Sequence, residues 1–449
     1  MFNVTDGVTS LQLLTPRGQF YGINSSDGAV AIGNHVYLPN FSGVARYEVV
    51  NGKFLYAQDS YKPAEVPYDG GQTGLTEHID RGLQLPLPLG GVQDQIFTTP
   101  AIGAEHVFRV DSASRNPFNA EWIGLDGPII VNPAIAAAGG TWTYVCGGEN
   151  CPNPGVYGND NVYVDISDFA PGFTNRYLIN DMTRDGATTG SPDTYQIVLN
   201  VFWWDQSEPL FGKWKHKASI ASPPIPTNGA NVGSTSITIA KHPTTGKLAA
   251  FVAHNIGVMV FDMEGLKAIG GQLGPLAFRQ NVETTSQVSG LAAVEDHVFF
   301  IENGLAADSE QMKGYVWTTS STIPLDVTPA NIWTKPLVNA LPESTLPRNP
   351  GQARRARVRN LPGSTGGFPN RHVYFAQDPY LIQWKWPRND NGTPKPNELD
   401  LTGYWRSDYD SFMQDCRIHD FPALSTAQGM TYVLVARETE AFALVGPIE

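Results

Sequence analysis

The segment Ala29-Val30-Ala31-Ile32-Gly33-Asn34-His35-Val36-Tyr37-Leu38-Pro39 decides the fold, because two short apolar runs flank a two-residue turn. Two further turns, Ser42-Gly43 and Asn51-Gly52, separate two more β-like runs, Val44–Val49 and Lys53–Ala57. An Asn-Gly pair between such runs is the strongest short-range signal for a hairpin. Residues 29–57 are therefore predicted to form a four-stranded antiparallel meander.

The phrase His35-Val36-Tyr37 recurs along the chain and indicates a repeat architecture. It returns as His106-Val107-Phe108, His297-Val298-Phe299 and His372-Val373-Tyr374. When each copy is taken as a second strand, weaker copies included, the anchors fall near residues 35, 106, 162, 248, 297, 372 and 431. Radially repeated four-stranded meanders are the blades of a β-propeller. We therefore predict an all-β, seven-bladed β-propeller that forms a single domain over residues 1–449.

Two segments bear on the number of blades and on how the ring ends. Tyr195–Trp204 is either a late strand of the third unit or an eighth blade, and the former is favoured. The last unit has one strand too few, whereas Thr9–Thr15 is a spare strand before the first complete meander. Pairing the two would complete the seventh blade and remove an open sheet edge.

Three Pro- and Gly-rich ranges are predicted to be long loop insertions, at residues 60–95, 220–233 and 336–369. Each is expected to follow the outer strand of one unit and to precede the first strand of the next. In a propeller such crossovers emerge on one face. Long loops without structure of their own are usually functional or disordered, so this face is expected to carry the function.

The composition predicts a folded, acidic protein. Aromatic residues make up 11% of the chain, the net charge is −13 and the pI is about 5.1. This charge disfavours general binding to nucleic acid, and no sequence-specific recognition is expected. No apolar stretch approaches the roughly 20 residues that cross a bilayer. The first residues lack the basic and apolar regions of a signal peptide. We therefore expect synthesis in the cytoplasm and no membrane partner.

Four arginines go against the acidic trend: Arg354, Arg355, Arg357 and Arg359. They fall in the third predicted loop. Such a cluster either grips phosphate, an acidic partner or another subunit, or belongs to a solvated loop. We take these four arginines as the candidate interaction residues.

An alternative chemistry rests on Asp408 and Asp410, which lie close to Tyr404 in the sequence. A carboxylate pair in an aromatic cleft could serve a polysaccharide lyase or glycoside hydrolase, with His419 as a further candidate. An exposed acidic strand would look the same, so both interpretations stay open. No catalytic residue is assigned outside this alternative.

No cofactor or metal is predicted. The chain lacks phosphate-binding, dinucleotide-binding and zinc-protease motifs. The recurring histidines are expected at turn exits near one rim, too far apart to share a metal with bonds of about 2 Å. Cys146 and Cys151 are read as two thiols or one local disulfide.

These observations favour a non-catalytic, structural propeller that interacts with other protein subunits, in a homo-oligomer or a multi-protein assembly. In length and predicted architecture the chain resembles the propeller-bearing tail hub or nozzle proteins of short-tailed phages. That resemblance implies incorporation into a virion and an acidic channel lining that would keep DNA from sticking. It covers architecture alone and carries no residue role over.

Overall fold

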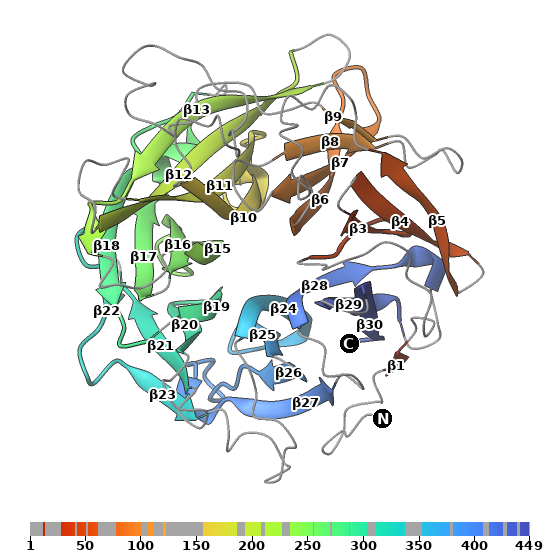
Figure 1. Ribbon diagram of the computed structural model, residues 1–449. Coiled ribbons are helices and arrows are strands. Elements are labelled where there is room, and N and C mark those ends of the chain that lie inside the picture. The colour runs from red at the N-terminus through yellow and green to blue at the C-terminus, as the bar shows by residue number, and fades with distance from the viewer. Residues whose placement is uncertain are drawn as a thin grey trace.

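The computed structural model describes residues 12–13, 28–40, 43–50, 53–61, 78–99, 106–110, 120–122, 156–185, 194–207, 212–226, 234–254, 256–269, 272–286, 288–302, 311–318, 320–336, 353–377, 380–406, 413–424, 429–437 and 441–448. Within these residues the chain forms seven antiparallel sheets of four or five strands. The sheets are arranged around a central axis, and each meander runs from an innermost strand outwards (Figure 1). The fold is all-β and propeller-like. No described helix is long and apolar enough to cross a membrane.

Sheets 1 and 2 are four-stranded meanders that follow chain order from the centre outwards. Sheet 1 contains β2 (Val30–Ile32), β3 (His35–Asn40), β4 (Gly43–Val50) and β5 (Lys53–Tyr61). Sheet 2 contains β6 (His78–Pro86), β7 (Val92–Thr99), β8 (His106–Val110) and β9 (Ala120–Trp122).

Sheets 3 and 4 have the same order, and sheet 3 has one additional short strand that pairs with β12. Sheet 3 contains β10 (Val156–Asp165), β11 (Arg176–Asp185), β12 (Thr194–Asp205), β13 (Lys213–Ala221) and β14 (Ile225–Pro226). Sheet 4 contains β15 (Ser234–Lys241), β16 (Leu248–His254), β17 (Gly257–Asp262) and β18 (Ala277–Glu283).

Sheets 5 and 6 continue the pattern, and sheet 7 joins the two ends of the chain. Sheet 5 contains β19 (Val288–Val294), β20 (His297–Glu302), β21 (Gln311–Trp317), β22 (Leu325–Asp326) and β23 (Trp333–Pro336). Sheet 6 contains β24 (Ala353–Thr365), β25 (Phe368–Gln377), β26 (Tyr380–Lys385) and β27 (Asp400–Arg406). Sheet 7 contains β28 (Met413–Asp420), β29 (Thr431–Arg437), β30 (Ala441–Gly446) and, paired with β30, β1 (Gln12–Leu13).

The described part of the chain also contains the 3₁₀ helices η1 (Ile166–Asp168), η2 (Glu264–Lys267), η4 (Pro396–Glu398) and η5 (Pro422–Leu424).

The first meander lies where the sequence places it. Gly33 and Asn34 form the turn between β2 and β3, and Gly33 has a φ of +56°. A left-handed backbone of this kind is readily adopted by glycine, as tight hairpin turns require. The segment from Tyr195 to Trp204 lies within β12, the third strand of sheet 3, and therefore belongs to the same sheet as its preceding unit.

Two of the predicted loop insertions are wrong in part. The range 60–95 contains β6 and the start of β7, and the range 336–369 contains β24 and the start of β25. Their loop-like composition comes from glycine, proline and charged residues, yet apolar residues still alternate, as at Ala356 and Val358. The range 220–233 contains β14, and residues 227–233 lie outside the described residues.

This error also shifted two of the strand anchors. His106 begins the third strand of sheet 2, and residue 162 lies in the first strand of sheet 3. The His-Val-aromatic phrase therefore marks a strand that leaves a turn, and its place within the sheet varies.

A β-bulge recurs in the innermost strands. In six sheets the pairing of the first two strands shifts by an extra residue, near Arg81, Asp160, Ser236, Leu291, Arg355 and Asp415. A bulge bends its strand and re-aims the side chains that follow. The innermost strands of these six sheets are thus bent where they pair with the second strand.

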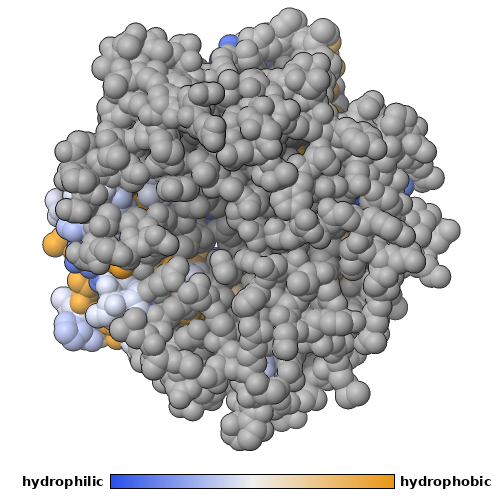
Figure 2. Space-filling model, viewed as in Figure 1, coloured by the Kyte–Doolittle hydropathy of each residue, from blue (hydrophilic) through white to orange (hydrophobic). Residues whose placement is uncertain are grey.

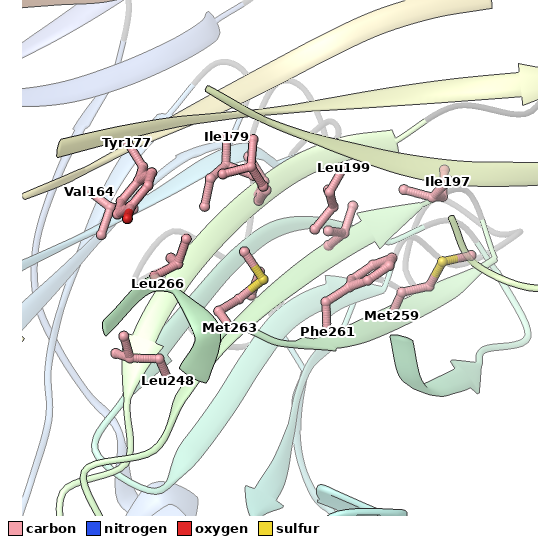
Figure 3. Packing of buried hydrophobic residues seen from close by; sticks show 14 of the residues in the cluster. Val164, Tyr177, Ile179, Ile197, Leu199, Leu248, Met259, Phe261, Met263 and Leu266 are labelled. Atoms are coloured by element: carbon pink, nitrogen blue, oxygen red, sulfur yellow. The ribbon is translucent and has the colours of Figure 1, made fainter. Parts of the chain in front are cut away.

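The hydrophobic core consists of layers between neighbouring sheets. Between sheets 3 and 4, Tyr177 and Leu199 face Leu248, Phe261 and other buried residues (Figure 3). Similar clusters lie between sheets 4 and 5, 5 and 6, 6 and 7, and 7 and 1. Because both faces of a sheet are covered, the strands read as nearly continuous apolar runs, as β16 does. On the side of β18 and β22, the described surface mixes hydrophilic and hydrophobic residues (Figure 2).

A buried polar chain crosses the layer between sheets 3 and 4. The Tyr195 hydroxyl donates to Nδ1 of His254 at 2.8 Å, and Nε2 of His254 donates to Oδ1 of Asn281 at 2.9 Å. Burial lowers the pKa of His254 from 6.5 to about 4, because the charged imidazolium would be removed from water. This histidine is therefore a neutral link between two sheets.

We expect acid to weaken this link. Between pH 6.5 and about 4 the unfolded chain binds a proton at His254 that the folded chain does not. The stabilisation is complete above the unfolded pKa and decreases as pH falls, with a loss of roughly 3 kcal/mol once the folded pKa is reached. Unfolding by urea across this range should show a shallower pH dependence in His254→Gln than in the wild type.

Tyr195→Phe is the matched control, because it removes one hydrogen bond and keeps the buried imidazole. It should lower the free energy of unfolding at every pH and retain most of the dependence of that free energy on pH. An unchanged slope in His254→Gln would contradict the assignment of this histidine.

Candidate functional site

The candidate site is a hollow of about 300 Å³ between innermost strands. Four innermost strands line it: β2 of sheet 1, β6 of sheet 2, β24 of sheet 6 and β28 of sheet 7. We call this space the axial hollow. Its lining residues are Val30, Ala31, Arg81, Gly82, Arg357, Val358, Arg417, Ile418 and His419.

The strand period explains why arginines of β24 reach this space. Ala356 and Val358 pack with Phe299 in the cluster between sheets 5 and 6. Successive side chains of a strand point to opposite faces. Arg357 and Arg359 therefore share the other face of β24, which is turned towards sheet 7.

Asp415 joins sheets 6 and 7 beside the hollow. Its Oδ1 accepts from Nη2 of Arg357 at 3.2 Å, and its Oδ2 lies 2.7 Å from Nη2 of Arg417. The backbone N–H of Cys416 also donates to Oδ1 of Asp415, at 2.7 Å. Since one carboxylate faces two guanidinium groups, this group of three carries a positive charge.

Arg81 reaches the hollow from the opposite side and is held by sheet 3. Its Nε and Nη2 donate to Oδ1 and the backbone carbonyl of Asn161, at 2.8 and 2.7 Å. The next residue, Gly82, lies against β2: a Cβ there would come within 2.7 Å of Cγ1 of Ile32. Glycine at this position therefore allows the innermost strands of sheets 1 and 2 to approach each other closely.

His419 is fixed at the seam between sheets 7 and 1. Its Nε2 donates to the carbonyl of Gly33 at 2.9 Å, and its ring meets Phe421 edge-on at 4.7 Å between centroids. Burial lowers the pKa of His419, so the ring is neutral at physiological pH. A neutral ring that donates from Nε2 presents Nδ1 as an acceptor.

The predicted interaction residues lie in a strand and not in a loop. All four arginines belong to β24, and Arg357 lines the axial hollow. Nη1 of Arg359 is buried without a hydrogen-bond partner among the described residues. The side chains of Arg354 and Arg355 lie outside the described residues.

Of the alternative catalytic residues, the structure describes Tyr404 and His419, which lie on different strands of different sheets. Tyr404 lies on β27, the outermost strand of sheet 6. It is buried there, and its ring centroid lies 6.1 Å from that of Tyr380. His419 lies on an innermost strand. Asp408 and Asp410 lie outside the described residues, as do Cys146 and Cys151. Among the residues that the structure describes, no group of three or more His, Cys, Asp and Glu side chains could hold a metal ion.

The lining differs from the acidic channel that the phage resemblance implies. Where the four strands form the hollow, its charged lining residues are arginines. Sequence reasoning missed Arg81 and Arg417, the first because its strand was taken as a loop. The period-2 pattern around Leu83 and Leu85 was the signal that could have identified this strand.

We expect Asp415→Asn to lower the free energy of unfolding by roughly 3 kcal/mol, because it leaves two guanidinium groups without their shared counter-charge. The control is Asp262→Asn, which breaks a more exposed pair with Arg279 and should cost roughly 0.5 kcal/mol. Urea unfolding of both variants measures the difference. Equal losses would show that the Asp415 pair is no more important than a surface pair.

No family model and no curated protein matches this chain. Among solved structures, the AfRom2 CNH domain is 10% identical, with 98% of this chain and 99% of that chain covered and a TM-score of 0.42. Drosophila Plexin A in complex with Semaphorin 1b is 8% identical, with coverage of 99% and 88% and a TM-score of 0.44. The K499G mutant of NanB sialidase from Streptococcus pneumoniae is 5% identical, with coverage of 82% and 68% and a TM-score of 0.43. These likenesses carry no residue role or activity over to this chain.

Proposed function

We propose that the chain is a non-catalytic interaction propeller, a subunit that binds other proteins in a larger assembly. The observation that carries this proposal is the convergence of Arg81, Arg357 and Arg417 from three sheets on one hollow. Arginine supplies charge and directed hydrogen bonds, but it stays protonated and cannot act as a general acid or base near neutral pH. A hollow lined in this way favours binding over proton transfer.

The proposed architecture is a closed ring of seven blades, in which β1 completes the last blade. The antiparallel pairing of Gln12 with Gly446 and of Leu13 with Val445 supports this proposal. Polar contacts between neighbouring sheets, such as that between His419 and Gly33, support it as well. Closure would give the hollow a fixed wall, because sheets 7 and 1 both line it.

Closure is tested by removing the backbone donors of β1. The double variant Gln12→Pro/Leu13→Pro should lower the free energy of unfolding by about 1–2 kcal/mol, the contribution of one or two backbone hydrogen bonds. Gln12→Thr/Leu13→Val keeps both N–H groups and should behave as the wild type. If the proline variant is as stable as this control, β1 does not close the ring.

The assembly proposal is tested by native mass measurement on material from the natural source. We expect a complex of defined stoichiometry with other subunits or with further copies of the chain. A virion or phage tail is one setting for such a subunit, and it rests on the resemblance of the predicted architecture alone.

The contrary result would be a monomer that cleaves acidic polysaccharides. Loss of that cleavage in Asp410→Asn, with Asp390→Asn as a control in an exposed loop, would establish the enzyme alternative in place of the assembly proposal. The same panel of polysaccharides tests both variants.

A further inference from the structure

We infer that the axial hollow is a binding site for a compact oxyanion, a carboxylate or a phosphate group, held by Arg81, Arg357 and Arg417. This inference rests on the proposed function, because it names the chemistry that the same hollow recognises. The group comes either from a free small molecule or from the acidic side chains of a protein partner.

The directions of the three side chains are set by the protein itself. Asn161 holds Arg81 through two hydrogen bonds, and Asp415 holds both Arg357 and Arg417. Guanidinium groups whose positions are fixed in advance lose less entropy when they bind an anion. They also bind carboxylate and phosphate through pairs of parallel hydrogen bonds.

Arg357 keeps donors for a ligand. A guanidinium has five N–H donors. The structure shows Nη1 of Arg357 donating to the carbonyl of Ala356 at 2.9 Å and Nη2 donating to Asp415 at 3.2 Å. The remaining N–H groups of a residue that lines the hollow can donate to an oxyanion.

A second observation lies two residues further along β24. Arg359 shares a face with Arg357, at about 6.6 Å along the strand. Its Nη1 is buried and has no hydrogen-bond partner among the described residues. Arg359 does not line the hollow itself, so it adds positive charge to this face of β24 without being counted as a contact of the ligand.

The rest of the lining limits the size and character of the ligand. The volume of about 300 Å³ lies at the lower end for small-molecule sites. Val30, Val358 and Ile418 supply apolar wall, and His419 also lines the hollow. The site therefore suits a small anion or the tip of one acidic side chain.

Titration calorimetry with inorganic phosphate and with citrate, at constant ionic strength, tests the inference. We expect saturable binding to the full chain, weakened about tenfold or more in Arg357→Gln because charge-assisted hydrogen bonds are lost. Arg279→Gln makes the same charge change at an exposed ion pair on β18 and should bind as the wild type does. No saturable binding of either anion, or equal weakening in both variants, would overturn the inference.

A second measurement uses the wild-type protein and does not depend on the folding of a variant. Phenylglyoxal modifies arginine, and mass spectrometry locates the modified residues. Phosphate should protect Arg357 and Arg417 while leaving Arg279 reactive. Equal protection of all three arginines would show a nonspecific effect of phosphate on their reactivity and would overturn the proposed binding site.

A hexaglutamate peptide distinguishes the two sources of the oxyanion. If the peptide displaces phosphate more effectively than citrate does at equal carboxylate concentration, the group belongs to a protein partner. If citrate is more effective, the ligand is a free small molecule. Displacement of phosphate by neither would overturn the inference, since both carry the required chemistry.

Two measurements distinguish failure of the oxyanion inference from failure of the proposed function. Native mass measurement of Arg357→Gln reports on assembly without any added anion. A wild-type protein that assembles but binds no anion would remove the oxyanion site alone. Anion binding by a protein that never assembles would remove the assembly proposal alone.

Discussion

Polar contacts between neighbouring innermost strands are the constraint on which the structure depends. The innermost strands contribute apolar residues such as Ile237 and Ala356 to the layers between sheets, and the buried polar groups beside them need hydrogen-bond partners. Asp160 shows the principle: its Oδ2 accepts from the backbone N–H of Ile237 in the next sheet, at 3.1 Å. Its Oδ1 accepts from the backbone N–H of Asn161 at 2.9 Å, so both carboxylate oxygens are held. Asp415 fulfils the same role between sheets 6 and 7.

The recurring bulge makes these contacts available. Asp160 and Asp415 both follow directly after the shifted pairing of their strands. An extra residue rotates the strand, so a side chain that would otherwise point along the sheet face turns towards the neighbouring sheet. Where the neighbour must come closer still, as at Gly82 beside Ile32, the side chain is absent. The cationic lining of the hollow is thus a consequence of how the innermost strands are joined.

Local turn chemistry was enough to predict the first meander and the all-β class from the sequence, because Gly33-Asn34 and the flanking apolar runs act at short range. Strands β6 and β24 were not predicted, because glycine, proline and charged residues between their apolar positions give them a loop-like composition. The site was out of reach for a different reason. Arg81, Arg357 and Arg417 are distant in sequence and meet only because their sheets do. His419, named from the sequence as a candidate catalytic residue, lines the hollow, whereas Tyr404 lies on the outermost strand of sheet 6.

The protonation states of the residues that line the hollow limit the chemistry that it can perform. Arginine remains charged well beyond neutral pH, and burial keeps His419 neutral there. The charge of the hollow is therefore nearly constant around pH 7, whereas an enzyme that works through a general acid and base depends on groups that titrate near its operating pH. Salt acts differently, because it screens the attraction between an entering anion and the partly exposed arginines. A site of constant charge is suited to holding an anion and poorly suited to exchanging protons with it, which is why binding is the function that this geometry supports.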